Sequence, residues 1–302
     1  MVYLIDASVY IFRAWYSLPP DIVDAEGQPT QALYGFARFL GELLERRQPR
    51  YVAVAFDSSL GSCFRHTLYP AYKANRETAP PELKRQFELC REYCRHLGVA
   101  EFASEAYEAD DLIGTLAAIC RAEGTGVTVV SRDKDLAQLI GPLDVFWDYG
   151  EAAEYRYEDI AARFGVPPER MADYLALRGD SVDNVPGVPG VGAKTAAALM
   201  TLCPSLEELF ERLDAVARLP LRGASSLPAR LQRHRDAAYL ARSLTRIVCD
   251  VPIGATQGDL QRRQPDLARI EAFCSGQGFG ALLHRQAVRL GAHRAIGAIG
   301  AL

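Results

Sequence analysis

The sequence has no run of about 18 apolar residues, the length that a helix needs to cross a bilayer. Its first residues, Met1 to Asp6, contain neither a basic segment nor a long apolar core before the first carboxylate. We therefore expect a cytoplasmic protein that neither spans a membrane nor carries an ordinary export signal.

Paired cysteines are also lacking. The seven cysteines are an odd number, none of them forms a C-x-x-C pair, and they stand at positions 63, 90, 94, 120, 203, 249 and 274. This pattern predicts reduced, mostly buried thiols and argues against structural zinc or a disulfide framework.

A large excess of charge of either sign is missing as well. The 34 basic and 38 acidic residues give a net charge of −4, which argues against a polyanionic partner unless the acids are concentrated in one place. What the sequence does have is 302 residues, 49% hydrophobic and 24% charged, enough for one large or two modest globular domains. We find no internal repeat.

Strands and helices alternate in the first half of the chain. Runs rich in β-branched and aromatic residues predict strands at 2–5, 51–56, 127–131 and 145–148, and helical patterns lie between them at 30–44, 81–97 and 109–123. This order predicts an α/β fold with a mostly parallel central sheet and flanking helices, of the PIN-like or Rossmann-like type.

Beyond residue 157 we expect only short helices joined by Gly and Pro turns, at 157–164, 168–177, 194–202, 205–216 and 228–248. The segment from about 252 has little pattern and is expected to be a loosely held tail of unknown role. The predicted domains are therefore an α/β core (1–165), a helical subdomain (166–250) and a C-terminal tail (251–302).

Acidic residues follow three of the predicted strands, at Asp6, Asp57 and Asp133. Because the carboxyl ends of parallel strands meet at one edge of a sheet, these side chains are expected to converge. Further acids lie in two neighbouring motifs, and the full candidate set is Asp6, Asp57, Glu108, Asp110, Asp111, Asp133, Asp135, Asp180 and Asp183. Without these nine acids the net charge changes from −4 to +5, so a nucleic-acid partner becomes plausible again.

Each acid also has a purely structural interpretation. A single Asp after a strand most often caps a helix or forms a turn, and Glu108 and Asp110 could simply complement a helix dipole. Five separate segments would each need such an explanation, so a shared site is favoured. Nine carboxylates in one cleft would need hard divalent cations, and oxygen ligands alone indicate Mg²⁺ or Mn²⁺ rather than zinc. Two such ions suit in-line hydrolysis of a phosphodiester.

A glycine-rich turn between two predicted helices runs from Asn184 to Ala196 and contains Gly187, Gly190, Gly192, Lys194 and Thr195. Such turns usually only connect helices. Here valines and glycines alternate before a lysine at the start of a helix, a pattern typical of a helix-hairpin-helix that binds the phosphate backbone of a duplex.

A second basic segment mixes cations with aromatic residues between positions 63 and 76, and contains Arg65, Tyr72, Lys73 and Arg76. Such mixing suits single-stranded nucleic acid, although a solvated loop has the same composition. Arg13, close to Asp6 in the sequence, has the same two interpretations.

Taken together, these motifs resemble the bacterial 5′ nuclease family. The matching patterns, over roughly residues 1–250, are Leu-Ile-Asp6, Ala-Phe-Asp57, Tyr72-Lys73-Ala-Asn-Arg76, Glu108-Ala-Asp110-Asp111, Asp133-Lys-Asp135 and Gly179-Asp180 followed by Asp183 and the glycine turn. The resemblance implies a structure-specific 5′-to-3′ exonuclease and flap endonuclease in primer removal or repair. Its partner would be DNA with a 5′ flap, nick or 5′ overhang, with RNA primer strands as a further candidate, and the protein would be a monomer.

The resemblance also implies roles for residues. Asp6, Asp57, Glu108, Asp110 and Asp111, the first acid group, would mostly hold one Mg²⁺, for which Mn²⁺ can substitute. Asp133, Asp135, Asp180 and Asp183, the second acid group, would hold the other. Asp57 and Asp133 count as catalytic together with Lys73 and Arg76 of a helical arch (about 60–82). The arch residues, Arg13 and the glycine turn would bind DNA, and the turn would also bind K⁺.

One departure is the absence of a lysine in 58–62, just after Asp57, where the family often has one. Two alternatives remain: a DNA-binding protein that senses flaps or nicks without cutting, and a PIN-type ribonuclease. The complete acid set argues against the first, and the glycine turn argues against the second.

Overall fold

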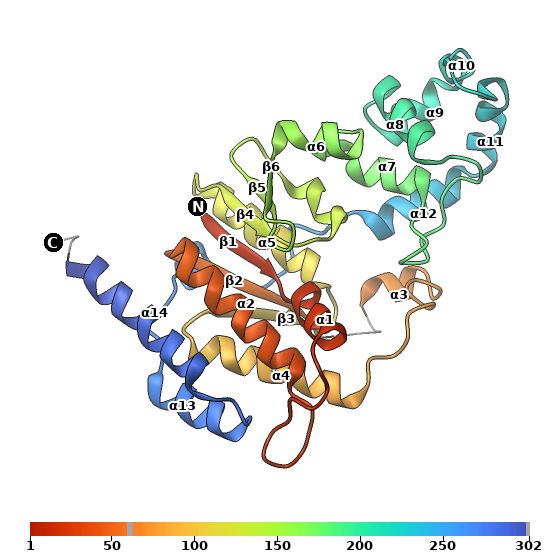
Figure 1. Ribbon diagram of the computed structural model, residues 1–302. Coiled ribbons are helices and arrows are strands. Elements are labelled where there is room, and N and C mark those ends of the chain that lie inside the picture. Colours follow the sequence, from red (N-terminus) through yellow and green to blue (C-terminus); the bar gives the residue numbers. More distant parts are fainter. Residues whose placement is uncertain (59–62, 300–302) are drawn as a thin grey trace. The chain divides into compact units, whose positions relative to one another are not determined.

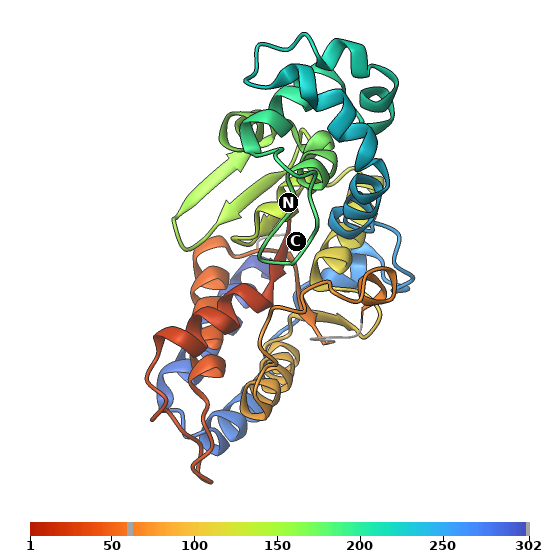
Figure 2. The ribbon, with the colours of Figure 1, turned by 90° about the vertical axis from the view of Figure 1, so that its right-hand side faces the viewer.

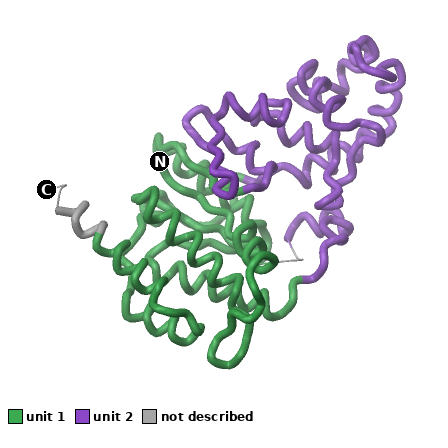
Figure 3. Tube along the Cα trace, in the orientation of Figure 1, with its two compact units in different colours: residues 1–58, 79–131, 249–302 green, residues 59–78, 132–248 purple. Residues whose placement is uncertain are grey.

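The computed structural model describes residues 1–58 and 63–299, with side chains described up to residue 292. The chain divides into two compact units (Figure 3). Unit 1 contains residues 1–58, 79–131 and the segment from Cys249 onward; unit 2 contains residues 63–78 and 132–248 of the described chain. Each unit is therefore assembled from separate stretches of the chain. The domain limits near residues 165 and 250 stay predictions.

Unit 1 is built on four parallel strands in the order β3-β2-β1-β4 (Figure 1). They are β1 (Val2–Asp6), β2 (Tyr51–Asp57), β3 (Ala100–Ser104) and β4 (Val127–Val130). The central strands read as nearly continuous apolar runs because they are buried on both faces. In the register, Asp6 is opposite Ala55, and Ile5 is opposite Val130, so the carboxyl ends of these strands lie at the same edge.

The helices of unit 1 follow from this strand order. They are α1 (Ala7–Ser17), α2 (Gln31–Arg47), α4 (Pro81–His96) and α5 (Ala109–Ala122). The chain passes from β1 to β2 and β3, then returns through α5 to β4 on the other side of β1. Right-handed crossovers therefore put α5 on the opposite face of the sheet from α2 and α4. The predicted mostly parallel α/β core is confirmed.

The C-terminal segment is folded onto unit 1, contrary to the expectation of a loosely held tail. It forms η4 (Gln257–Leu260), a short 3₁₀ helix, followed by α13 (Leu267–Gly276) and α14 (Ala281–Ile299). Helix α13 packs on α4 and α14 packs on α2, as Figures 1 and 2 both show. The apolar side chains that this packing buries include Ile270 and Leu283. Residues 300–302 lie outside the described chain.

Unit 2 is mostly helical. It contains one antiparallel pair of strands, β5 (Val145–Asp148) and β6 (Ala153–Arg156). Its helices are α3 (Phe64–Leu68), η1 (Lys134–Leu139), α6 (Tyr157–Phe164), η2 (Pro168–Arg170), α7 (Met171–Arg178), α8 (Ala193–Leu202), α9 (Leu206–Glu211), α10 (Leu213–Val216), η3 (Ala224–Ser226), α11 (Leu227–Arg233) and α12 (Arg235–Thr245). Short helices in place of strands after residue 157 are confirmed.

Membrane insertion was not expected from the sequence. In the part of the chain that the structure describes, no helix combines the length and apolar character required to cross a bilayer.

Candidate active site and nucleic-acid interface

Asp6 lies at the point where the strand order of unit 1 reverses, between β1 and β4. Its side chain caps α1 by accepting a hydrogen bond from the Ser8 N–H at 3.1 Å. Its other oxygen accepts from the hydroxyl of Ser131, just after β4, at 2.8 Å. In open parallel sheets this reversal forms the ligand crevice, so Asp6 has the position expected of a site residue.

Asp57 connects the first turns of two helices in unit 1. One carboxylate oxygen accepts from the Ser8 hydroxyl at 2.7 Å, and the other accepts from the Ala109 N–H at 2.8 Å. The start of α5 and the start of α1 are therefore both bonded to the end of β2. This brings the acidic first turn of α5 to the same edge of the sheet as Asp6.

Glu108 and Asp111 form a capping box at the start of α5, in which Asp111 accepts from the Glu108 N–H at 3.1 Å. Asp111 is fully buried, and Asp110 is half-buried in the same turn. The helix-capping interpretation is thus correct for Asp6, Glu108 and Asp111, and it positions the first acid group rather than replacing its predicted role.

The second acid group lies in unit 2 and is organised around Lys134. Asp133 caps η1 by accepting from the Asp135 N–H at 2.9 Å. The Lys134 Nζ lies 2.5 Å from an Asp180 oxygen and 3.4 Å from Asp135 Oδ1. Asp180 also accepts from the Val182 N–H at 2.8 Å. Two distant segments are therefore joined through one lysine.

Asp135 carries the clearest electrostatic signature in this group. Burial raises the pKa of its carboxyl, and the charges of Asp133, Asp180 and Asp183 raise it further, with partial compensation by Lys134. Asp135 Oδ1 is buried and accepts no hydrogen bond. The oxygen accepts no hydrogen bond and, among the described residues, has only the Lys134 ammonium at 3.4 Å as a counter-charge, so its place among other carboxylates fits a bound cation.

Asp180 has the opposite behaviour. Burial would raise the pKa of its carboxyl, but the bond from Lys134 and the backbone N–H groups outweigh burial and lower it. Asp180 is therefore held in the ionised form that metal ligation requires.

Lys73 and Arg76 both contact Asp183 in unit 2. The Lys73 Nζ is 3.8 Å from one carboxylate oxygen, and the Arg76 guanidinium pairs with the other. The backbone supports this arrangement, because the Lys73 N–H donates to the Asp183 carbonyl at 2.9 Å. The two predicted catalytic cations are thus placed at the second acid group.

Arg65 and Tyr72 do not have the exposure that their predicted DNA contacts require. Arg65 is 2% exposed, and its guanidinium donates to the carbonyls of Leu244 at 2.8 Å and Arg246 at 3.0 Å. Tyr72 is 3% exposed, with its ring edge-on to His66. Composition does not distinguish such a buried anchor from a solvated contact, and the DNA-binding role of both residues stays a prediction. Arg13, by contrast, is exposed on α1.

The glycine turn precedes α8, with exposed Gly192 as its N-cap and exposed Lys194 and half-buried Thr195 in its first turn. Gly187 has a structural reason to be glycine, because a Cβ there would lie 2.5 Å from the Arg178 carbonyl.

Gly190 has a left-handed φ of 76°, and a Cβ there would collide with the guanidinium of Arg230 in α11. The close approach of Arg230 to the turn was missed from the sequence. Its only signal there was the density of arginines between residues 230 and 235.

No group of three or more His, Cys, Asp or Glu residues is arranged to hold a metal ion among the described residues. The ligand assignment for both acid groups stays a prediction. The sequence has no lysine at 58–62, and positions 59–62 lie outside the described chain.

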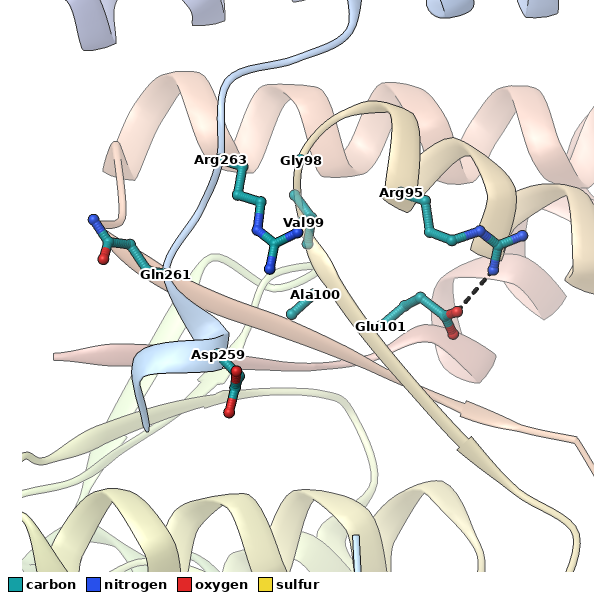
Figure 4. A pocket seen from close by; sticks show the side chains of 8 residues that line it. All are labelled: Arg95, Gly98, Val99, Ala100, Glu101, Asp259, Gln261 and Arg263. Carbon is teal, nitrogen blue, oxygen red and sulfur yellow. Dashed lines mark hydrogen bonds and ion pairs between the residues drawn. The ribbon is translucent and has the colours of Figure 1, made fainter. Parts of the chain in front are cut away.

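A pocket of about 360 Å³ in unit 1 is separate from these acids (Figure 4). It lies at the amino end of β3, opposite the edge that carries Asp6 and Asp57, and Arg95 there donates to Glu101 at 2.7 Å. It contains none of the predicted site residues.

A parallel sheet with carboxylates at one edge and a glycine hairpin before a helix are features of a metal-dependent nuclease. Residues 1–165 match the family model for the 5′-3′ exonuclease N-terminal resolvase-like domain, and residues 166–268 match that for the 5′-3′ exonuclease C-terminal SAM fold. The chain belongs to the 5′-3′ exonuclease family, which confirms the resemblance seen in its motifs.

Two relatives illustrate how much of a larger protein the chain matches. DNA polymerase I of Rhizobium leguminosarum is 40% identical over 259 residues, which are 83% of this chain and 25% of the polymerase. The thermostable DNA polymerase I of Thermus filiformis is 37% identical over 284 residues, 94% of this chain and 33% of the polymerase. The chain therefore spans a quarter to a third of the length of these relatives.

Solved structures share the fold. The T5 5′-exonuclease with bound divalent metal ions (zinc) aligns with a TM-score of 0.64 and 20% identity, covering 96% of this chain and 97% of the other. The catalytic core of Rad2 in complex with DNA substrate aligns with a TM-score of 0.63 and 15% identity, covering 95% and 90%. At these identities the likeness shows the fold alone.

Proposed function

We propose that the chain is a divalent-metal-dependent 5′ nuclease that cuts DNA where a duplex meets a 5′ single strand. It acts as a 5′-to-3′ exonuclease and flap endonuclease, in the cytoplasm and as a monomer, in primer removal or repair. The observation that carries the proposal is the second acid group, where a buried oxygen of Asp135 accepts no hydrogen bond and three further carboxylates, Asp133, Asp180 and Asp183, lie close enough to raise its pKa. The metal-bound T5 exonuclease and the DNA-bound Rad2 core support it as members of the same fold.

The chain's residues have distinct roles in this proposal. The first and second acid groups would each hold one Mg²⁺ or Mn²⁺, and the ions would supply an activated water and charge stabilisation at the phosphate. Lys73 and Arg76 would stabilise the negative charge that develops on the phosphate oxygens. The turn at Gly190 to Lys194 would hold the duplex backbone, with K⁺ at its carbonyls, and would read no base sequence.

End-labelled flap, nicked and 5′-overhang DNA test the proposal directly. We expect cleavage with Mg²⁺ or Mn²⁺, none with EDTA, and binding without cleavage with Ca²⁺. Asp133→Asn should reduce kcat at least about 100-fold while DNA binding persists, because it removes a ligand of a catalytic ion but no contact to DNA. Robust cleavage in EDTA would refute the metal mechanism. Binding without cleavage under every metal condition would identify a junction sensor instead.

A further inference from the structure

Lys134 is a cation built into an anionic site. In the sequence it lies between Asp133 and Asp135, two members of the second acid group. Its ammonium contacts a third member, Asp180. Its side chain is 33% exposed, while that of Asp180 is 8% exposed. The contact is therefore partly shielded from water. Coulomb attraction is stronger in such a shielded position than at an open surface.

The charge of the second acid group is nearly balanced by the chain itself. The group has four carboxylates. Lys134 contacts those of Asp180 and Asp135. Lys73 and Arg76 contact that of Asp183. All these residues belong to unit 2. A flexible ammonium on a four-carbon stem can move away from a carboxylate when a stronger counter-charge arrives.

We propose that Lys134 holds the place of a divalent cation in the metal-free protein and competes with that cation for Asp180 and Asp135. Lys134 is in this sense a positioning residue that keeps the four acids together before the ion binds. An entering ion of charge +2 takes over Asp180 and Asp135 and displaces the ammonium. The inference rests on the proposed function only in assuming that the second acid group binds a metal.

Removal of the Lys134 charge distinguishes a competing cation from a purely structural ion pair. If Lys134 only supported the fold, removing its charge would weaken metal binding or leave it unchanged, because the acids would be less well ordered. If it competes with the ion, a neutral side chain of similar length must tighten metal binding. Lys134→Met is the matched substitution, since Met is unbranched and of similar length and has no charge.

Direct Mn²⁺ binding to the full chain without DNA measures this, by titration calorimetry and by electron paramagnetic resonance of the free ion. We expect Lys134→Met to bind one of its Mn²⁺ ions about tenfold more tightly, the effect of removing one partly screened charge from the site. Lys134→Arg, which keeps the charge, should bind like the parent. Lys84→Met, which removes an exposed lysine of α4, is the matched control and should not change affinity.

Asp180 provides the second half of a double-mutant cycle. In the Asp180→Asn background the gain from Lys134→Met should fall to less than half, because the main partner of the ammonium is gone. In EDTA, Lys134→Met should melt at a lower temperature than the parent. Saturating Mn²⁺ should raise the melting temperature of Lys134→Met by more than it raises that of the parent.

The outcomes separate the two claims. Equal or weaker Mn²⁺ binding by a folded Lys134→Met overturns the competition while leaving the nuclease proposal intact. A variant that fails to fold in EDTA and is not rescued by Mn²⁺ also overturns it, because the metal should replace the lost charge. If the parent protein binds no Mn²⁺ at all, both the inference and the proposed metal mechanism fail.

Discussion

The guanidinium of Arg65 is buried in unit 2 and closes a contact between α3 and α12. Its donors satisfy the carbonyls of Leu244 and Arg246 at the end of α12, where helix carbonyls lack partners within the helix. We expect Arg65→Met to lower the free energy of unfolding by about 2 to 4 kcal/mol, because it leaves two buried carbonyls without donors. Urea denaturation followed by circular dichroism measures this.

The exposed Arg13 is the control for Arg65. Arg13→Met should change the free energy of unfolding by less than about 0.5 kcal/mol, because exposed side chains contribute little. Equal stability of Arg65→Met and the parent would show that water reaches the end of α12 and replaces the guanidinium.

How far single residues could be predicted from sequence depended on the range of their contacts. Asp6 and Asp57 end strands with clear apolar patterns, so the sheet edge followed from local sequence. The role of Lys134 depends on Asp180, which is 46 positions away and reached only through the fold. Arg65 depends on a segment 179 positions away, and no local pattern distinguishes its burial from exposure.

The strands missed from the sequence, β3 and β6, are those with little β-branched character. β3 reads Ala-Glu-Phe-Ala-Ser and β6 reads Ala-Glu-Tyr-Arg, and both are held in place by a better strand beside them. Pairing with a neighbour can override weak local preference, because strand propensity largely reflects packing against neighbours.

Two basic residues of unit 2 lie at or beside the glycine turn, one in α8 and one in α11. Lys194 is exposed in the first turn of α8, and Arg230 of α11 lies against Gly190. We expect Lys194→Ala and Arg230→Ala each to weaken binding to plain duplex DNA and to flap DNA alike. Each should reduce the slope of log K against log salt by about 1, the share of one released counterion.

The matched comparison for these two residues is Lys73→Ala. Lys73 belongs to the segment proposed to contact only the single strand, so its loss should lower turnover more than affinity and leave binding to plain duplex unchanged. Fluorescence anisotropy in Ca²⁺ across a salt series, on matched duplex and flap DNA, measures all three variants. Duplex binding that survives Lys194→Ala, or that falls equally with Lys73→Ala, would contradict this division of roles.

Helices α13 and α14, near the end of the chain, pack on helices α4 and α2 and complete unit 1. Helix α14 approaches α2 so closely that a Cβ at Gly41 would collide with the side chain of Gln286. Glu45 of α2 also accepts from Gln286 at 2.9 Å and from Arg289 at 2.7 Å. Local pattern could not reveal this, because α13 and α14 bury their apolar residues against helices that lie far away in the sequence.

Removing α13 and α14 by ending the chain after Asp266 should therefore destabilise the sheet core that carries Asp6 and Asp57. Burial of Ile270, Phe273 and Leu283 alone suggests a loss of about 5 to 9 kcal/mol, at roughly 1.5 to 3 kcal/mol for each side chain. Calorimetric unfolding in EDTA, which avoids stabilisation by bound metal, measures the loss.

Two single substitutions separate this packing effect from a general effect of shortening the chain. The ring centroids of Phe273 and Tyr93 on α4 are 6.0 Å apart. Phe273→Ala should therefore lower the free energy of unfolding by about 3 kcal/mol. Val288 is 41% exposed on α14, so Val288→Ala should cost less than about 0.5 kcal/mol. If Phe273→Ala and the shortened chain both melted like the parent, α13 would not be part of the cooperative core of unit 1. The acids at the edge of the sheet would then be supported by β1, β2 and α5 alone.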